Sequence, residues 1–322
     1  MPAEWAPHER TLMGWPARAD MWEAHFAQAK ADYARIADAI AAFEPVLMAA
    51  SPAQVQEARS ACGAGVEVVA IPLDDSWVRD SGPIFVVDGA GRRVGVDFGF
   101  NAWGEKFHPF ADDAAYAERV LAHLGEERTA APLVLEGGSI AVDGAGTLLT
   151  TEQCLLHPSR NPGLSREEIE TALVEWLGVE RVVWLGQGLV EDLDTDGHVD
   201  NCAAFLGPGR VLVQTVADEA NPNWPACRQN VARARAAGLE VVELPLLPYV
   251  EHAGPATVVP YTNFYVCNGA VIVPVGGAET DAEALAWLGE LWPGREVVPV
   301  PGTSLAHGGG GVHCITQQVP AA

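Results

Sequence analysis

Four short polar segments hold the residues best suited to chemistry. Cys314 ends the glycine-rich segment HGGGGVHC, and a cysteine thiolate is a strong nucleophile. The other segments are WVRDSGP with Asp80, LEGGSI with Glu136, and DTDGHVDN with His198 and Asp200. A positioned histidine can protonate a leaving amine and later activate water. Two further carboxylates suit forked pairing with a planar cation such as guanidinium. These residue types indicate cysteine-dependent chemistry on a cationic carbon.

Each residue also has a plainer interpretation. A single cysteine is usually a small buried apolar residue. Asp80 beside Arg79 fits an ion pair at a strand end, and Glu136 before two glycines fits the start of a turn. If DTDGHVDN is an extended strand, His198 and Asp200 point to the same side and fit a structural pair. The combination is more specific than any single residue.

Three other chemistries use some of the same residues. A papain-like protease also has a reactive cysteine, but its oxyanion hole needs N–H donors and not a ring of carboxylates. Gly308–Gly311 could cradle a phosphate, yet no GK[ST] follows and no helix is indicated. His198, His313 and Cys314 could bind a metal, but the H-x-x-x-H spacing on a helix is missing.

A weak internal repeat places these segments in the chain. Four stretches read as a strand, a glycine turn and a second strand, a strong hairpin signal. They are residues 83–98, 139–151, 201–215 and 263–275, with turn glycines Gly89, Gly144, Gly209 and Gly269. Helices are expected over 21–43, 112–127, 165–178, 224–239 and 280–292, and Ser165 with Glu168 forms a capping-box pattern. Short apolar strands follow at 66–71, 132–137, 181–186, 240–246 and 296–302.

The unit of hairpin, helix and strand therefore occurs about five times, and its last copy is incomplete. The strand CITQQV lacks a partner, and RTLMGW near the N-terminus is the candidate that would close a ring. A closed ring leaves few exposed strand edges. We therefore expect one domain over residues 1–322. Equivalent places in a ring face one axis, so Asp80, Glu136, His198, Asp200 and Cys314 should surround one cavity.

The composition of the chain limits the classes of molecule that it is expected to bind. The 322 residues have a formal net charge of −24, which repels nucleic acid and anionic membranes and attracts small cations. No run approaches the roughly 20 apolar residues of a membrane helix, and the N-terminus lacks a secretory signal. The six cysteines form no CxxC pair, so neither disulfides nor a zinc ribbon are indicated. We expect a soluble, cytoplasmic protein, and a homo-oligomer is compatible with the sequence.

At its motifs the sequence resembles the agmatine deiminase family, within the guanidine-modifying superfamily that is related to bacterial-type peptidyl-arginine deiminases. The matching segments run along the whole chain: MPAEWAPHERTLMGWP, DDSWVRDSGP, FNAWG, LEGGSI, HPSRNPGLSREEIE, DTDGHVDN and HGGGGVHCITQQ. The resemblance implies an α/β fold, a single-domain five-fold pseudosymmetric propeller of repeated ββαβ units. It also implies no cofactor and no metal.

The resemblance assigns roles to individual residues. Cys314 resembles the family's nucleophile, His198 its general acid and base, and Glu136 the acid that orients this histidine. The residues that resemble the substrate-binding set are Asp80 and Asp200 for the guanidinium, and Asp194 and Trp77 nearer the other end of the substrate. Trp103 is also expected to bind the substrate. The sequence departs from the family at two positions. Gly311 stands where the family usually has Asn, and Asp194 stands where some members have Glu.

The implied reaction is hydrolysis of agmatine to N-carbamoylputrescine and ammonia through a covalent amidino-cysteine intermediate. Agmatine is preferred because Arg79 is the only basic residue singled out in these motifs, so little is available to bind a substrate carboxylate. Deimination of peptidyl-arginine or another alkylguanidine is the main alternative. An amidinotransferase, and a non-catalytic propeller that binds a cation or a protein, are further alternatives.

Overall fold

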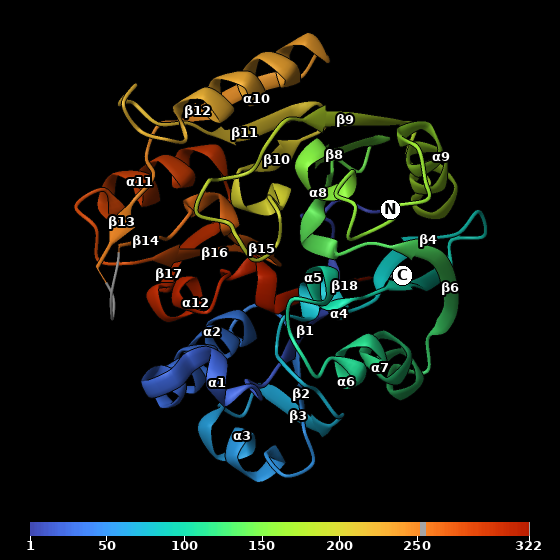
Figure 1. Cartoon of the computed structure of the whole chain (residues 1–322). Helices are drawn as coiled ribbons and strands as arrows, with labels where there is room; N and C mark the ends of the chain where they lie inside the picture. Colours follow the sequence, from blue (N-terminus) through green and yellow to red (C-terminus); the bar gives the residue numbers. More distant parts are fainter. Residues whose placement is uncertain (252–255, 322) are drawn as a thin grey trace.

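The protein has a mixed α/β fold, seen in a computed structural model that describes residues 1–251 and 256–321 (Figure 1). Among these residues five sheets share one pattern, an antiparallel pair followed by a parallel strand. Three of them are β4 (Ile84–Val87), β5 (Arg93–Gly99) and β6 (Glu127–Val134); β7 (Ile140–Val142), β8 (Thr147–Thr151) and β9 (Arg181–Leu185); and β10 (Ala203–Gly207), β11 (Arg210–Gln214) and β12 (Glu240–Leu244). The fourth is β15 (Tyr265–Cys267), β16 (Ala270–Val275) and β17 (Glu296–Pro301).

The fifth sheet confirms the predicted pairing of the first and last strands. β18 (Thr316–Pro320) pairs antiparallel with β1 (His8–Gly14), with Met13 opposite Thr316. β1 is parallel to β2 (Val46–Ala50), which is parallel to β3 (Val66–Ala70). A separate two-stranded ribbon joins β13 (Tyr249–Val250) and β14 (Thr257–Val258).

The four predicted hairpins are all present, with one turn glycine shifted. Gly144 adopts the left-handed conformation (φ 69°), as expected for a hairpin turn. In the first hairpin Gly91 takes this role (φ 79°) and Gly89 does not. The strand predicted at 132–137 was also displaced: β6 begins at Glu127, because Gly125 ends the preceding helix at φ 73° and the chain turns directly into the strand.

The long helices lie between the parallel strands of each sheet; five of them fall in the predicted ranges, and α3 (Val55–Ala61) was not predicted. The longer ones are α2 (Phe26–Ala41), α3 (Val55–Ala61), α7 (Tyr116–Leu124), α9 (Arg166–Leu177), α10 (Trp224–Ala236) and α11 (Asp281–Leu291). The short ones are α1 (Ala19–Trp22), η1 (Glu23–His25), α6 (Ala111–Ala114), α8 (Glu152–Leu155) and α12 (Thr303–His307). Both hydrogen bonds of the Ser165–Glu168 capping box form at the start of α9. In the described part of the chain, no helix is long and apolar enough to cross a membrane.

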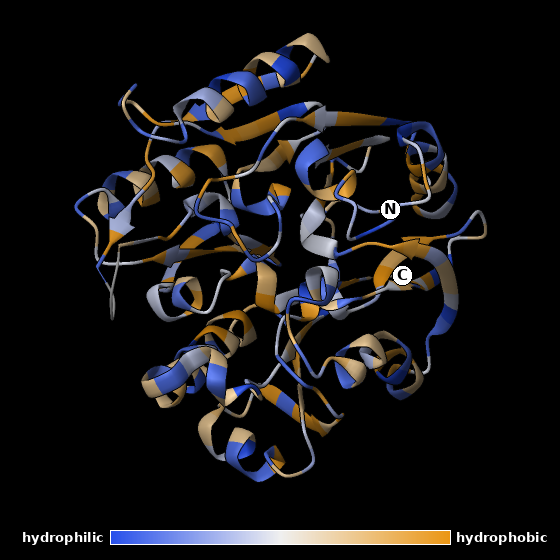
Figure 2. Ribbon diagram, viewed as in Figure 1, coloured by the Kyte–Doolittle hydropathy of each residue, from blue (hydrophilic) through white to orange (hydrophobic). Residues whose placement is uncertain are grey.

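The strands supply much of the apolar core, and the outer helices are amphipathic. Figure 2 shows the strands largely in orange, whereas a peripheral helix such as α10 carries both blue and orange residues. All five residues of β2 and all five of β8 are buried. This packing leaves the ends of the strands to position polar side chains.

Five one-turn helices precede the first strand of the five antiparallel pairs, and four of them contain or adjoin the predicted site residues. They are α4 (Val78–Ser81), η2 (Gly137–Ser139), η3 (Val199–Asn201), η4 (Tyr261–Asn263) and η5 (His313–Ile315). α4 contacts η2 and η5, η2 contacts η3, and η3 contacts η4. The extended conformation considered for DTDGHVDN was therefore wrong: His198 caps a short helix in which Asp200 lies.

Candidate active site

Cys314 lies in η5 with its side chain buried among polar groups. The Asn263 side-chain amide donates to Sγ at 3.3 Å, and Sγ lies 3.6 Å from Oδ2 of Asp200. Burial raises the pKa of the Cys314 thiol well above its ordinary value, and the carboxylates of Asp200 and Asp80 raise it further. The thiol is therefore neutral in the empty site at neutral pH.

Three predicted residues converge on the backbone of Gly138. A side-chain carbon on Gly138 would lie 2.6 Å from Nδ1 of His198, 2.9 Å from Oδ2 of Asp200 and 2.9 Å from Oδ1 of Asp80. A carbon in that position would be too close to all three groups. The absence of a side chain at Gly138 therefore lets the His198 ring and the Asp80 and Asp200 carboxylates lie close to one another.

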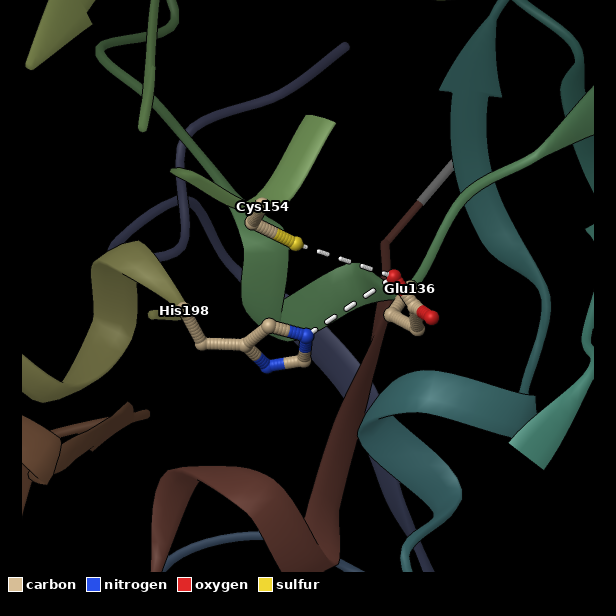
Figure 3. Close-up of side chains that lie close together, drawn as sticks. All are labelled: Glu136, Cys154 and His198. Atoms are coloured by element: carbon tan, nitrogen blue, oxygen red, sulfur yellow. Dashed lines mark hydrogen bonds and ion pairs between the residues drawn. The ribbon is translucent and has the colours of Figure 1, made fainter. Parts of the chain in front are cut away.

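His198 is completely buried, and a carboxylate lies near each of its ring nitrogens. Figure 3 shows the ring with Glu136 beside it. Nδ1 lies 3.8 Å from Oδ1 of Asp80, and Nε2 lies 3.8 Å from Oε2 of Glu136. Neither ring nitrogen has a hydrogen-bond partner among the described residues. Burial opposes a charge on the ring, but Asp80, Cys154 and Glu136 outweigh it and raise the pKa of His198 well above its ordinary value. The imidazole can therefore hold a proton to donate.

Glu136 is fixed on its other oxygen by Arg160. Nε of Arg160 donates to Oε1 at 2.7 Å, and both side chains are fully buried. Burial acts to raise the pKa of Glu136, but His198 and Arg160 reverse this and lower it overall. Glu136 thus remains a carboxylate that faces Nε2 of His198.

Asp80 and Asp200 differ in their protonation although both are buried. Burial raises the pKa of Asp80 to about 6, and the nearby charge of His198 only partly offsets this. For Asp200, burial acts in the same direction, but a hydrogen bond from His313 outweighs it and lowers the pKa. Oδ1 of Asp200 has no hydrogen-bond partner among the described residues. Asp200 is therefore held in its ionised form, whereas the protonation of Asp80 changes with the charges around it.

A small pocket lies beside Cys314 and Asp80. Trp77, Trp103 and Asp194 line it, together with Met21 and Phe107. The Asp194 carboxylate forms no hydrogen bond with the described residues. Its pKa is raised, mainly by burial and to a smaller extent by the negative charge of Asp192. The pocket thus brings together the Cys314 thiol, aromatic walls and the Asp194 carboxylate.

Trp103 is presented by an unusual left-handed turn, α5 (Ala102–Glu105), in which four consecutive residues have positive φ angles of 52°, 55°, 89° and 62°. Such a turn costs non-glycine residues roughly 1–2 kcal/mol each. The Asn101 side chain accepts from the Gly104 amide at 2.9 Å and stabilises it. As a result, Nε1 of Trp103 donates to Oδ2 of Asp80 at 3.0 Å. Backbone strain of this kind is concentrated at functional sites.

Several residues of the site were not predicted. Asn263 ends η4, and besides contacting Cys314 it accepts from the His313 amide at 3.0 Å. The structure also explains the space at Gly311, because a side-chain carbon there would lie 2.3 Å from Oδ1 of Asn263. Arg160 and Glu4 were not singled out either, and their contacts join segments far apart in the sequence.

Glu136, Cys154 and His198 are the described residues whose donor atoms lie close enough together for a metal ion, within 4.8 Å (Figure 3). This set differs from the one considered from the sequence, since Cys154 replaces His313 and Cys314. The Arg160 guanidinium on Glu136 adds a positive charge that disfavours a cation at this position. The cluster is explained as well by the support that Glu136 gives to His198.

Comparison with known proteins agrees with this geometry. Residues 1–320 match the family described as Porphyromonas-type peptidyl-arginine deiminase. The agmatine deiminase of Stutzerimonas stutzeri is 44% identical, over 100% of this chain and 95% of its own length. A structure of Enterococcus faecalis agmatine deiminase catalysing its reaction has a TM-score of 0.94 at 35% identity, covering 99% of this chain and 95% of that one. A structure of C. jejuni agmatine deiminase with substrate bound has a TM-score of 0.93 at 27% identity, covering 100% and 96%. The chain belongs to the Porphyromonas-type peptidyl-arginine deiminase family.

Proposed function

We propose that this protein hydrolyses the guanidinium group of agmatine to N-carbamoylputrescine and ammonia. The observation that carries the proposal is the convergence of His198, Asp200 and Asp80 beside Gly138, with the Cys314 thiol 3.6 Å from Asp200. Full-length relatives that are named agmatine deiminases support the choice of substrate.

In the first step the bound substrate cation favours ionisation of the Cys314 thiol. Asp80 and Asp200 bind the guanidinium, and the added positive charge offsets the burial and the two carboxylates that keep Cys314 protonated. The thiol then loses its proton to solvent. Its thiolate attacks the guanidinium carbon and forms a neutral tetrahedral adduct.

His198 completes the two remaining steps. Its protonated ring donates to one amino group of the adduct, so ammonia leaves and an amidino-thioether cation remains on Cys314. The neutral ring then takes a proton from water, and the resulting hydroxide attacks the same carbon. Collapse of the second adduct forms the urea product and returns a proton to the Cys314 sulfur. Glu136 stabilises the charged ring throughout.

The pocket walls support a substrate with a short apolar chain and a distal cation. Trp77, Trp103 and Phe107 suit a chain of methylene groups, and Asp194 suits the ammonium. No basic residue is among the described residues that line this pocket, so a free arginine carboxylate would have no partner there. Peptidyl-arginine, which lacks this carboxylate, is the second candidate, and it rests on the description of the matching family.

Further features follow from the same proposal. The five sheets with one strand pattern support a five-fold pseudosymmetric propeller formed by a single domain over residues 1–322. Six unpaired cysteines suit a reducing cytoplasmic compartment. The mechanism uses neither a metal nor another cofactor, and a homo-oligomer is compatible with it.

One assay tests the substrate and the cofactor requirement together. Purified protein, treated with EDTA, is given agmatine, free arginine or an arginine-containing peptide, and the ureido product is measured. We expect turnover of agmatine at a kcat/KM at least 100-fold above that of the other two substrates. Preference for the peptide would replace the proposed substrate, and loss of activity with EDTA that zinc restores would contradict the metal-free mechanism.

A further inference from the structure

Glu4, in the segment that precedes β1, reaches the catalytic residues from the opposite end of the sequence. Its Oε2 accepts from Nε2 of His313 at 2.7 Å, although the two residues are 309 positions apart. Nδ1 of His313 bonds to Oδ2 of Asp200 at 2.8 Å, and this oxygen lies 3.6 Å from Sγ of Cys314. The four residues therefore form one continuous chain of polar contacts.

The position of Glu4 is itself fixed. Its Oε1 accepts from the Val266 amide of β15 at 2.8 Å, and Nη2 of Arg79 lies 3.7 Å from Oε2. Arg79, in α4, also donates to the carbonyl oxygen of His313 at 3.2 Å. Glu4 is thus held by two elements besides its own segment.

The charges around His313 explain what this arrangement does. An imidazole that bonds to a carboxylate at each nitrogen can donate from both only when it is protonated. Burial and Arg79 act to lower the pKa of His313, but Glu4 and Asp200 outweigh them and raise it. Burial likewise acts to raise the pKa of Glu4, yet His313 and Arg79 lower it to about 2. His313 is therefore a cation held between two anions.

The protonated His313 ring explains why the pKa of Asp200 is lowered while that of Asp80 is raised. The charged groups around Asp200 are His313, His198, Arg79, Asp80 and the Cys314 thiol. Asp80 also faces an imidazole with a carboxylate beyond it, His198 with Glu136, but both separations are 3.8 Å and neither is a hydrogen bond. The hydrogen bonds of Asp80 come from the Trp103 ring and the Gly138 amide. The second carboxylate of the guanidinium site thus depends on a residue that does not touch the substrate.

We propose that Glu4 is a positioning residue of the active site, which holds His313 so that Asp200 stays ionised with Oδ1 directed to the substrate guanidinium. The expected effect of Glu4 on turnover rests on the proposed function. Its expected effect on the binding of a cation beside Cys314 is independent of that function.

Glu4→Gln is the sharpest variant, because the amide oxygen of glutamine can still accept a hydrogen bond from Nε2 of His313 while the negative charge is lost. Loss of a charged hydrogen bond is worth about 1.5–3 kcal/mol, which corresponds to roughly 10- to 150-fold. We expect KM for agmatine to rise about tenfold or more, with kcat changed by less than about threefold. The acid limb of kcat/KM should move to higher pH, since Asp200 then ionises less readily. Glu9→Gln is the matched control, because Glu9 lies on β1 with an exposed side chain that pairs with Arg93.

A second measurement does not depend on turnover. Cys314 is labelled with a cationic haloacetamidine and, separately, with neutral iodoacetamide, in wild type, Glu4→Gln and Glu9→Gln. We expect Glu4→Gln to slow labelling by the cationic reagent about tenfold and to leave the neutral reagent nearly unaffected. Equal slowing of both reagents, or an unchanged pH profile with a lowered kcat, would show that Glu4 only stabilises the fold. If wild type does not turn over agmatine, the labelling ratio still decides the role of Glu4.

Discussion

Asp194→Asn should separate recognition of the substrate's distal amine from the chemistry at its guanidinium. Asp194 lines the pocket that contains Cys314, its carboxylate has no hydrogen bond among the described residues, and its pKa is raised by burial first and then by Asp192. A carboxylate in this state is stabilised when a cation arrives. The asparagine side chain has nearly the same shape and lacks the charge.

The size of the effect follows from the burial of Asp194. An exposed ion pair contributes about 0.2–1 kcal/mol, whereas a hydrogen bond to a charged group in a sheltered place contributes about 1.5–3 kcal/mol. The pocket wall shelters Asp194 and the substrate covers it further, so the larger range applies. We expect kcat/KM for agmatine to fall roughly 10- to 150-fold. Butylguanidine, which has no distal amine, should lose less than about twofold.

The assay compares kcat/KM for both substrates in wild type and Asp194→Asn. Glu219→Gln is the control for the change in net charge, because Glu219 is exposed and lies in the loop after β11, outside the residues that line the pocket. This control should change neither substrate measurably. Equal losses on agmatine and butylguanidine would refute the assignment of Asp194 to the amine. The choice of agmatine would then depend on the relatives alone.

Three further predictions concern the nucleophile, the closing strand and pH. Cys314→Ala should abolish turnover and haloacetamidine labelling while the melting temperature stays within a few degrees; residual turnover above a few per cent would exclude Cys314 as the nucleophile. Deleting residues 1–16 removes β1, the partner of β18, and should unfold the protein at assay temperature; an unchanged melting temperature would contradict the closure. Because burial raises the pKa of Asp80 to about 6 and the ionised form binds the cation, kcat/KM should fall as the pH drops below about 6; a profile that is flat down to pH 5 would refute this role. The raised pKa of Asp80 also stabilises the folded state at low pH. This contribution to the free energy of unfolding is lost as the pH rises through about 6.

The site residues that lie in the internal repeat could be predicted from the sequence. Hairpin turns and the capping box are local signals, so strands, helices and their order could be predicted from neighbouring residues. The repeat then identified Asp80, Glu136, His198, Asp200 and Cys314 as neighbours, because each lies in or beside the short helix before a hairpin. The same argument applies to the fourth unit, whose residue at this place is Asn263, and it could have been found in the same way.

Other features have no local signal. Glu4 and Arg160 act through contacts with residues distant in sequence, and nothing near them indicates a charged partner. The left-handed turn that carries Trp103 includes residues that normally avoid positive φ, so pattern reasoning predicts a different conformation. The helical conformation of 199–201 was missed because the alternation of polar residues suggested a strand.

The pairing of β1 with β18 also determines when the enzyme can become active. β1 is synthesised long before its antiparallel partner β18, because most of the fold lies between them in the sequence. Contacts between such distant segments form slowly, and an unpaired strand edge is prone to association while it waits. Cys314 lies just before β18, and Glu4 just before β1. Cys314 and Glu4 therefore come together in the step that closes the sheet, so nascent and partly folded chains lack the assembled guanidinium site. Catalytic activity should accordingly be a direct measure of completed folding during biosynthesis.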